Sequence, residues 1–188
     1  LYGTGVVLYS GSSIAAGGGG NVTIDGTGGN GTSNNDGVAT NSGSSITAEA
    51  GNIEITGTAG GTASQNRGVN IAGTTLTTTG GNIALVGTGS GTGSSNTGVF
   101  TATATLTTAG LGNITIQGTA GTGGLNTTYN QGVRLATTTA TTATGYIDID
   151  GTGSATGSGT YATGVQLLTS ILQTSGLGAG SSIAVDGT

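Results

Sequence analysis

The sequence contains no proline, cysteine, methionine, tryptophan or histidine among its 188 residues. Without cysteine the chain can form neither a disulfide nor a thiolate–metal site, and the redox compartment cannot be read from the sequence. No signal peptide is recognisable at the start, and no methionine is present to begin translation. We therefore expect a mature product or a segment of a longer protein.

Charge is also scarce, because charged residues make up only 5% of the chain and the net charge is −5. Arg67 and Arg134 are the only cations. Binding to nucleic acid needs several cations on phosphates, and attraction to an anionic membrane surface needs them as well. No apolar run approaches the roughly 20 residues of a membrane-spanning helix. We therefore expect no nucleic-acid partner and no membrane insertion.

Glycine is abundant, with 43 copies, and the rest of the chain is rich in Ser, Thr and Asn. Such a composition is found in flexible linkers. Here, however, Val, Ile and Leu recur at regular intervals among the threonines, and β-branched residues at this spacing favour strands. The pattern indicates an ordered all-β chain.

One short motif recurs along the whole chain. Residues 51–58 read Gly-Asn-Ile-Glu-Ile-Thr-Gly-Thr, with apolar residues two apart, polar residues between them and a Gly-Thr exit. The other five copies begin at Asn21, Asn82, Asn113, Tyr146 and Ser182. Six copies in one chain identify a repeat protein.

Gly-Val pairs mark the start of each repeat, near residues 5, 37, 68, 98, 132 and 164. Each unit carries three strand-like pieces in a fixed order. We predict an all-β parallel β-helix (β-solenoid) of about six coils of 30–36 residues, with three short strands per coil. Residues 1–188 would form a single array. A period of two with glycine throughout excludes helices, and an antiparallel sandwich would not repeat three strand types in one order.

Stacking about 4.8 Å per coil places each strand type on its own copies. Ile53 and Ile55 then point inward, over the matching apolar pairs of the coils on either side. One asparagine precedes the third strand of each early coil, and its amide can bond along the axis. The predicted structural ladder consists of Asn21, Asn52, Asn82 and Asn113.

Both ends of the array look like ordinary repeat, although solitary solenoids need polar caps. The partners we expect are further repeats of the same chain or identical subunits stacked end to end. Host or matrix carbohydrate or protein is a further candidate partner.

The acidic residues Asp148, Asp150 and Asp186 form the only acid cluster, and stacking would place Asp150 and Asp186 in one outward column. Their oxygens suit calcium, or they could act as an acid–base pair. No cation accompanies them, so a solvated face is the alternative that we favour. We predict no cofactor and no catalytic residue.

Asn30 and Asn126 lie in the Gly/Ser/Thr tracts that return the chain to the next coil, and both begin Asn-x-Thr acceptor sequences. They are candidate glycosylation sites. Phe100 points outward beside Arg134 of the next coil, where it could anchor a lateral contact.

The units Gly-Asn-Ile-x-Ile-x-Gly-Thr and Gly-Val-x-Leu resemble the β-solenoid repeats of large bacterial surface and secreted proteins, the filamentous-haemagglutinin and autotransporter-type adhesins. The resemblance covers the whole chain. It implies secretion, an extracellular or cell-surface location, a long stalk, and surface attachment or matrix building. It offers no catalytic residues.

The first hypothesis is therefore a structural, non-catalytic segment of an extracellular bacterial fibre or adhesin stalk. One alternative is a subunit that assembles end to end into extracellular filaments. Another is a carbohydrate-binding or polysaccharide-degrading β-helix protein, although degradation would need a basic group near the acids.

Overall fold

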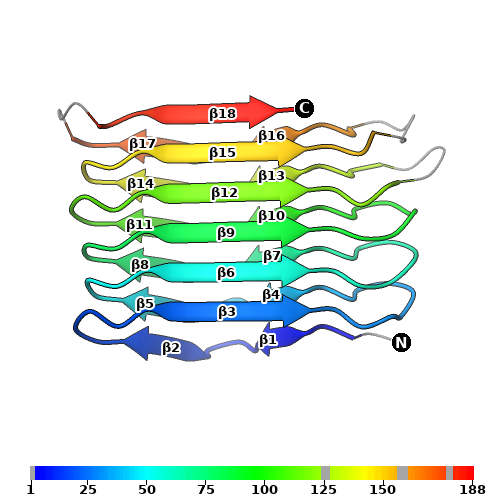
Figure 1. Cartoon of the computed structure of the whole chain (residues 1–188), viewed down its shortest axis with the longest axis horizontal. Helices are drawn as coiled ribbons and strands as arrows, with labels where there is room; N and C mark the ends of the chain where they lie inside the picture. The colour runs from blue at the N-terminus through cyan, green and yellow to red at the C-terminus, as the bar shows by residue number, and fades with distance from the viewer. Residues whose placement is uncertain (1–2, 124–127, 156–160, 177–179) are drawn as a thin grey trace.

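The structure is a computed structural model that describes residues 3–123, 128–155, 161–176 and 180–188. Its strands stack as the coils of a β-solenoid, with one strand of each coil in each of three parallel sheets (Figure 1). Each sheet holds six strands, one from each repeat, so the predicted fold class is confirmed. The described residues contain no helix, and hence none long and apolar enough to cross a membrane.

The first sheet begins each coil at the Gly-Val pair. Its strands are β1 (Val6–Leu8), β4 (Val38–Thr40), β7 (Val69–Ala72), β10 (Val99–Ala102), β13 (Val133–Ala136) and β16 (Val165–Leu168). The second sheet contains β2 (Ser13–Ala16), β5 (Ser45–Ala48), β8 (Thr75–Thr78), β11 (Thr105–Thr108), β14 (Thr139–Thr142) and β17 (Ile171–Thr174). The third sheet holds the opening motif, in β3 (Val22–Thr27), β6 (Ile53–Thr58), β9 (Ile83–Thr88), β12 (Ile114–Thr119), β15 (Ile147–Thr152) and β18 (Ile183–Gly187).

The register of the third sheet follows the repeat without a slip. Ile53 pairs with Val22 on one side and Ile83 on the other, and Ile55 keeps the same order. Ile53, Ile55 and Ile83 are fully buried, and Glu54, between the first two, faces outward. Parallel strands gain one hydrogen-bonded neighbour per coil on each side, so every copy of the motif stabilises the next.

Threonine also occupies inward positions, where its hydroxyl needs a partner. In the second sheet the buried Thr78 and Thr108 hydroxyls donate to the carbonyl oxygens of Gly81 and Gly112, at 2.6 and 2.7 Å. The buried hydroxyl of Thr40, in β4 of the first sheet, lies 2.7 Å from that of Thr74, which stands between β7 and β8. The interior therefore contains hydroxyl groups, but these are hydrogen-bonded, which removes most of the cost of burying them.

The glycines of the Gly-Thr exit and the Gly-Val start meet at one corner of the coil. A Cβ atom on Gly57 would overlap the carbonyl oxygen of Gly68, and a Cβ atom on Gly68 would overlap the backbone nitrogen of Thr88. Backbones can approach this closely only when neither residue carries a side chain. This contact explains why both glycines recur in every repeat.

The corner between the first and second sheets has a left-handed residue in four successive coils. They are Gly73, Thr103, Thr137 and Thr169, with φ between 50° and 55°. Threonine is strained in this conformation because its branched Cβ crowds the backbone. Thr103 has an exposed side chain, so the strain is not compensated by burial.

The two ends of the stack differ in how well they cover the core. The inward residues Leu8 and Val22 of the first coil are only 6% exposed. In the last coil, Leu167, Ile183 and Val185 are 42%, 44% and 45% exposed. β18 lies at the edge of the third sheet, and in Figure 1 it is the outermost strand at the C-terminal end. The last coil thus presents an apolar surface in the same register as every interior coil.

Candidate functional site

The predicted asparagine column lies on the outer surface, at the start of the third sheet. The backbone N–H of Asn52 donates to the side-chain Oδ1 of Asn21 at 2.8 Å, and Asn82 and Asn113 repeat this bond one coil further on at the same distance. The side-chain amide of Asn82 also donates to Asn52 at 3.3 Å. Asn113 accepts from the backbone of Tyr146 at 2.9 Å. The series stops there because tyrosine has no amide oxygen to continue it.

A shallow groove of about 340 Å³ runs beside this column, lined by Glu54, Tyr146 and three of the asparagines. Tyr146 is 39% exposed and faces the groove from the end of the asparagine column. The lining offers a carboxylate, a phenol and amides, which are hydrogen-bonding groups without a cation. Such a set can bind polar molecules, but it holds no paired acid and base for proton transfer.

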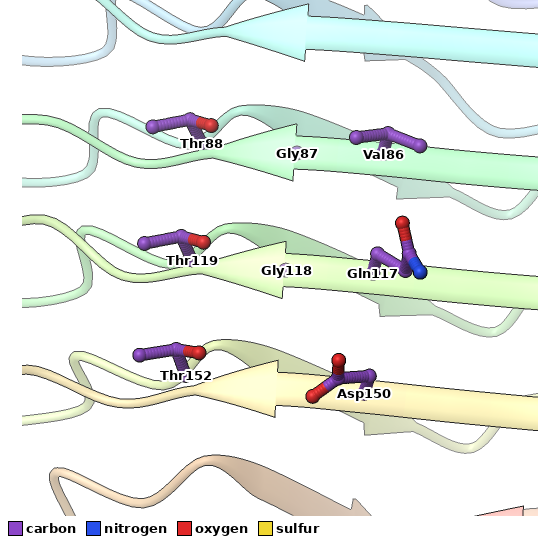
Figure 2. A pocket seen from close by; sticks show the side chains of 8 residues that line it. All are labelled: Val86, Gly87, Thr88, Gln117, Gly118, Thr119, Asp150 and Thr152. Carbon is purple, nitrogen blue, oxygen red and sulfur yellow. The ribbon is translucent and has the colours of Figure 1, made fainter. Parts of the chain in front are cut away.

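A second groove, of about 230 Å³, follows the opposite end of the same strands. Figure 2 shows its two outward rows, one formed by Val86, Gln117 and Asp150 and the other by threonines. The rows are separated by Gly87 and Gly118, so the floor is bare backbone. The side chains that line the groove carry one carboxylate, together with hydroxyl, amide and methyl groups.

The structure places the three acidic candidates on neighbouring strands of the third sheet. Asp150 of β15 pairs with Asp186 of β18 in the outward column expected from the repeat. Asp148 lies two residues before Asp150 and pairs with Ala184. Within the described part of the chain, no three acidic side chains are gathered into a group that could hold a metal ion.

Of the two candidate glycosylation sites, Asn30 is exposed in the tract that follows β3. Asn126 lies outside the described residues. The remaining Asn-x-Thr sequences begin at Asn21 and Asn113, whose side-chain oxygens accept the backbone bonds described above.

A second asparagine ladder, which the sequence reasoning missed, lies inside the molecule. Its members stand two residues before the Gly-Val pair and are at most 1% exposed: Asn35, Asn66, Asn96 and Asn130. The N–H of Asn66 donates to Oδ1 of Asn96 at 3.1 Å, and the N–H of Asn96 donates to Asn130 at 2.8 Å. The Nδ2 group of Asn96 donates to the carbonyl oxygens of Ala63 and Gly93 at 2.8 and 2.9 Å. This ladder closes the return tract onto the core.

The sequence does carry a signal for this ladder, because asparagine recurs at that offset in four consecutive repeats. The offset falls inside a tract rich in asparagine, serine and glycine, where one column does not stand out. The two ladders also run in opposite directions. In the outer one the acceptor oxygen belongs to the earlier coil, and in the inner one it belongs to the later coil.

Both cations of the chain converge on Phe100. The guanidinium carbon of Arg67 lies 4.4 Å from the centre of the Phe100 ring, and that of Arg134 lies 5.4 Å from it. Arg134 also lies 4.9 Å from the ring centre of Tyr129. Tyr129 in turn stacks on Tyr161, with 5.2 Å between ring centres and 8° between ring planes. We call these five residues the arginine–aromatic column.

Next to this column, Asp36 is almost completely buried, with 6% of its surface exposed. Its carboxylate accepts the backbone N–H of Arg67 at 2.9 Å and the side-chain amide of Asn70 at 2.8 Å. Burial raises the pKa of Asp36, and these two bonds and the charge of Arg67 offset only part of the rise. Burial likewise lowers the pKa of Arg67; the carboxylate of Asp36 opposes this change, and the charge of Arg134 adds to it.

No known protein family, curated protein or solved structure matches this chain.

Proposed function

We propose that the chain is a structural, non-catalytic segment of an extracellular bacterial fibre or adhesin stalk. The observation that carries this proposal is the unbroken register of all three sheets. Phe100, for example, pairs with Asn70 before it and Arg134 after it, and every other strand pair keeps its repeat position in the same way. Each further coil in this register lengthens the rod without changing its cross-section, which is what a stalk requires.

The outer surface supports the same role. Outward positions of the second sheet are mostly threonine, as in the pairing of Thr75 and Thr105, and the grooves of the third sheet carry few charged groups. Such a surface displays hydroxyl groups along a rod, and across residues 3–123, 128–155, 161–176 and 180–188 it groups no acid, base and nucleophile in the way that catalysis uses. The extracellular setting and the bacterial source come from the likeness of the repeats to adhesin stalks.

The location is tested with an antibody against the chain, applied to intact and to permeabilised cells of the source organism. A surface stalk labels equally well before and after permeabilisation, whereas a cytoplasmic enzyme serves as a control that labels only afterwards. Labelling of the chain only after permeabilisation would refute the stalk.

A second candidate function is end-to-end assembly of separate chains into a filament. The apolar surface of the last coil favours it, because Leu167, Ile183 and Val185 are exposed in the register of an interior coil, and β18 is an edge strand. An exposed strand edge is a template for pairing with another chain. A further coil of the same chain would cover this surface equally well.

Two matched variants test the filament. Val185 points along the inward row of β18, and its neighbour Ala184 lies on the outward row; both are exposed. If filaments form, Val185→Lys should abolish them, because a buried unpaired lysine is costly, while Ala184→Lys should leave them intact. A wild-type chain that stays monomeric at every concentration in sedimentation would exclude the filament.

Polysaccharide degradation is the weakest of the alternatives. It would need Asp150 and Asp186 to act beside a basic group, and the chain's only two cations lie at Phe100, on the first sheet. Turnover of an acidic polysaccharide that is lost in Asp150→Asn would establish it.

A further inference from the structure

Two members of the arginine–aromatic column, Phe100 and Arg134, stand at an outward position that is not repeated from coil to coil. In the first sheet, the outward position that follows the Gly-Val pair holds a different residue in each of the last four coils: Asn70, Phe100, Arg134 and Gln166. Identical neighbours would form a structural ladder. Here the unlike neighbours contact one another through cation–π interactions instead, which bring two partly exposed arginines together.

Aromatic rings contact both guanidinium groups, and Arg134 has one donor without a hydrogen-bond partner among the described residues. Aromatic rings hold Arg134 on two sides, and its Nε atom is buried without a hydrogen-bond partner among the described residues. Both arginine residues are partly exposed, and the carboxylate of Asp36 acts electrostatically on Arg67. The one nearby carboxylate, Asp36, is already bonded to the backbone of Arg67 and to Asn70.

The two positive charges face the same ring and repel each other, and the Asp36 carboxylate near Arg67 offsets only part of the unfavourable effect on Arg67, so a further anion bound at the guanidinium groups is favoured. Arginine is suited to this role because its planar fork binds a carboxylate through two parallel hydrogen bonds. The guanidinium carbons of Arg67 and Arg134 lie 4.4 and 5.4 Å from the centre of the same Phe100 ring, which allows them a separation of up to about 10 Å. An extended acidic disaccharide has about that length and can present a carboxylate at each end.

The surroundings favour a sugar chain over an acidic peptide. The Tyr161 ring stacks on Tyr129 and is 50% exposed, so part of it is open to stack on a sugar ring. The Gln131 amide donates to Gln166 at 3.1 Å beside the column, and such amides can hydrogen-bond sugar hydroxyls. The straight axial arrangement fits a stiff linear polymer.

We propose that the arginine–aromatic column binds a carboxylate-bearing polysaccharide along the axis of the solenoid. Arg67 and Arg134 each hold one carboxylate, and Tyr161 stacks on a sugar ring at the end of the column. Because the whole chain carries a net charge of −5, general electrostatic attraction does not bring an acidic polymer to it. Binding must then depend on these two arginines. It is independent of whether the chain is part of a stalk or of a filament.

The test is a calorimetric titration of the whole chain with polygalacturonate and, in parallel, with the same polymer after its carboxylates have been methyl-esterified. We expect binding of the acid form at low salt, weakening as salt is raised, and loss of binding to the ester. This comparison uses the wild-type protein and needs no variant to fold. Equal binding of both polymers, or binding of neither, would overturn the proposal.

Variants then locate the site. Arg67→Gln and Arg134→Gln should each weaken binding by about tenfold or more, since each removes charge-assisted hydrogen bonds. Gln117→Glu makes the same change in net charge on the exposed face of the third sheet and should leave affinity within about twofold. If Arg134→Gln does not fold, Arg67→Lys/Arg134→Lys keeps the charge but removes the fork and should still weaken binding. Unchanged affinity in the arginine variants, or equally tight binding of polyglutamate, would refute the proposed site or its ligand class.

Discussion

The buried asparagine ladder makes a quantitative prediction that distinguishes it from the exposed one. In Asn96→Ala, the buried N–H of Asn66 loses its acceptor, and the carbonyl oxygens of Ala63 and Gly93 each lose one of their two donors. The Ala63 oxygen keeps the N–H of Gly93, and the Gly93 oxygen keeps the Nδ2 group of Asn130. A buried donor left unpaired costs about 1–3 kcal/mol, and each of the other two bonds contributes about 1 kcal/mol. We expect a loss of about 3–5 kcal/mol in the free energy of unfolding.

Asn82→Ala in the outer ladder is the matched control. It removes the acceptor of the Asn113 N–H and the donor to Asn52, which is the same kind of loss at an exposed position. Water can replace both partners there, so the expected cost is about 1 kcal/mol or less.

Because repeat arrays can open one part at a time, amide hydrogen exchange is the better assay, with urea unfolding as a second measurement. The Asn66 amide should exchange about a hundredfold or more faster in Asn96→Ala, and distant coils should change less. If Asn96→Ala and Asn82→Ala lowered the free energy of unfolding equally, the reasoning would be refuted, because burial would then not determine how much each hydrogen bond contributes to stability.

Three further predictions concern the backbone and one buried charge. Thr103→Gly should raise the free energy of unfolding by about 1 kcal/mol in urea, because glycine is not strained in the left-handed conformation that Gly73 adopts at the same position one coil earlier. A lower free energy of unfolding would show that Thr103 is not strained. Gly57→Ala should cost about 2–4 kcal/mol, whereas Gly19→Ala, whose Cβ atom meets nothing, should be nearly neutral in the same assay. Burial raises the pKa of Asp36 above 3.8, so the folded state favours the protonated carboxyl, and the free energy of unfolding falls as pH rises from 3.8 through the raised pKa. Asp36→Asn should remove this fall when unfolding is measured as a function of pH. An identical pH profile in the variant and the wild type would contradict the prediction.

The stacking of the coils could be predicted from the sequence because it depends on local periodicity. The two-residue alternation around Ile53 and Ile55 sets which side chains face inward, and the spacing of the Gly-Val pairs sets which residues meet in the next coil. Both are properties of a single repeat compared with its neighbours. The pairing of Asp150 with Asp186 followed from the same comparison.

The inner ladder and the arginine–aromatic column could not be predicted in this way. Whether Asn96 faces the core depends on the path of the return tract, where the left-handed Ser95 turns the chain just before it. Arg67 reaches Phe100 from a corner of the previous coil, and Tyr129 reaches Arg134 from a return tract. These contacts depend on the shape of corners, which have no simple alternation of inward and outward residues.

The contrast between repeated and unrepeated positions suggests where function lies in such a chain. A residue that supports stacking is constrained by its neighbours above and below, so its type recurs, as glycine does at Gly57 and Gly87. Phe100 has no such constraint, because Asn70 and Arg134 occupy its place in the adjacent coils. Stacking alone would be served as well by threonine at all three positions. Outward positions such as Val86 and Gln117 vary as well, but the unlike residues at Phe100 bring both cations of the chain together, so we expect this face to make the first contact with an acidic ligand.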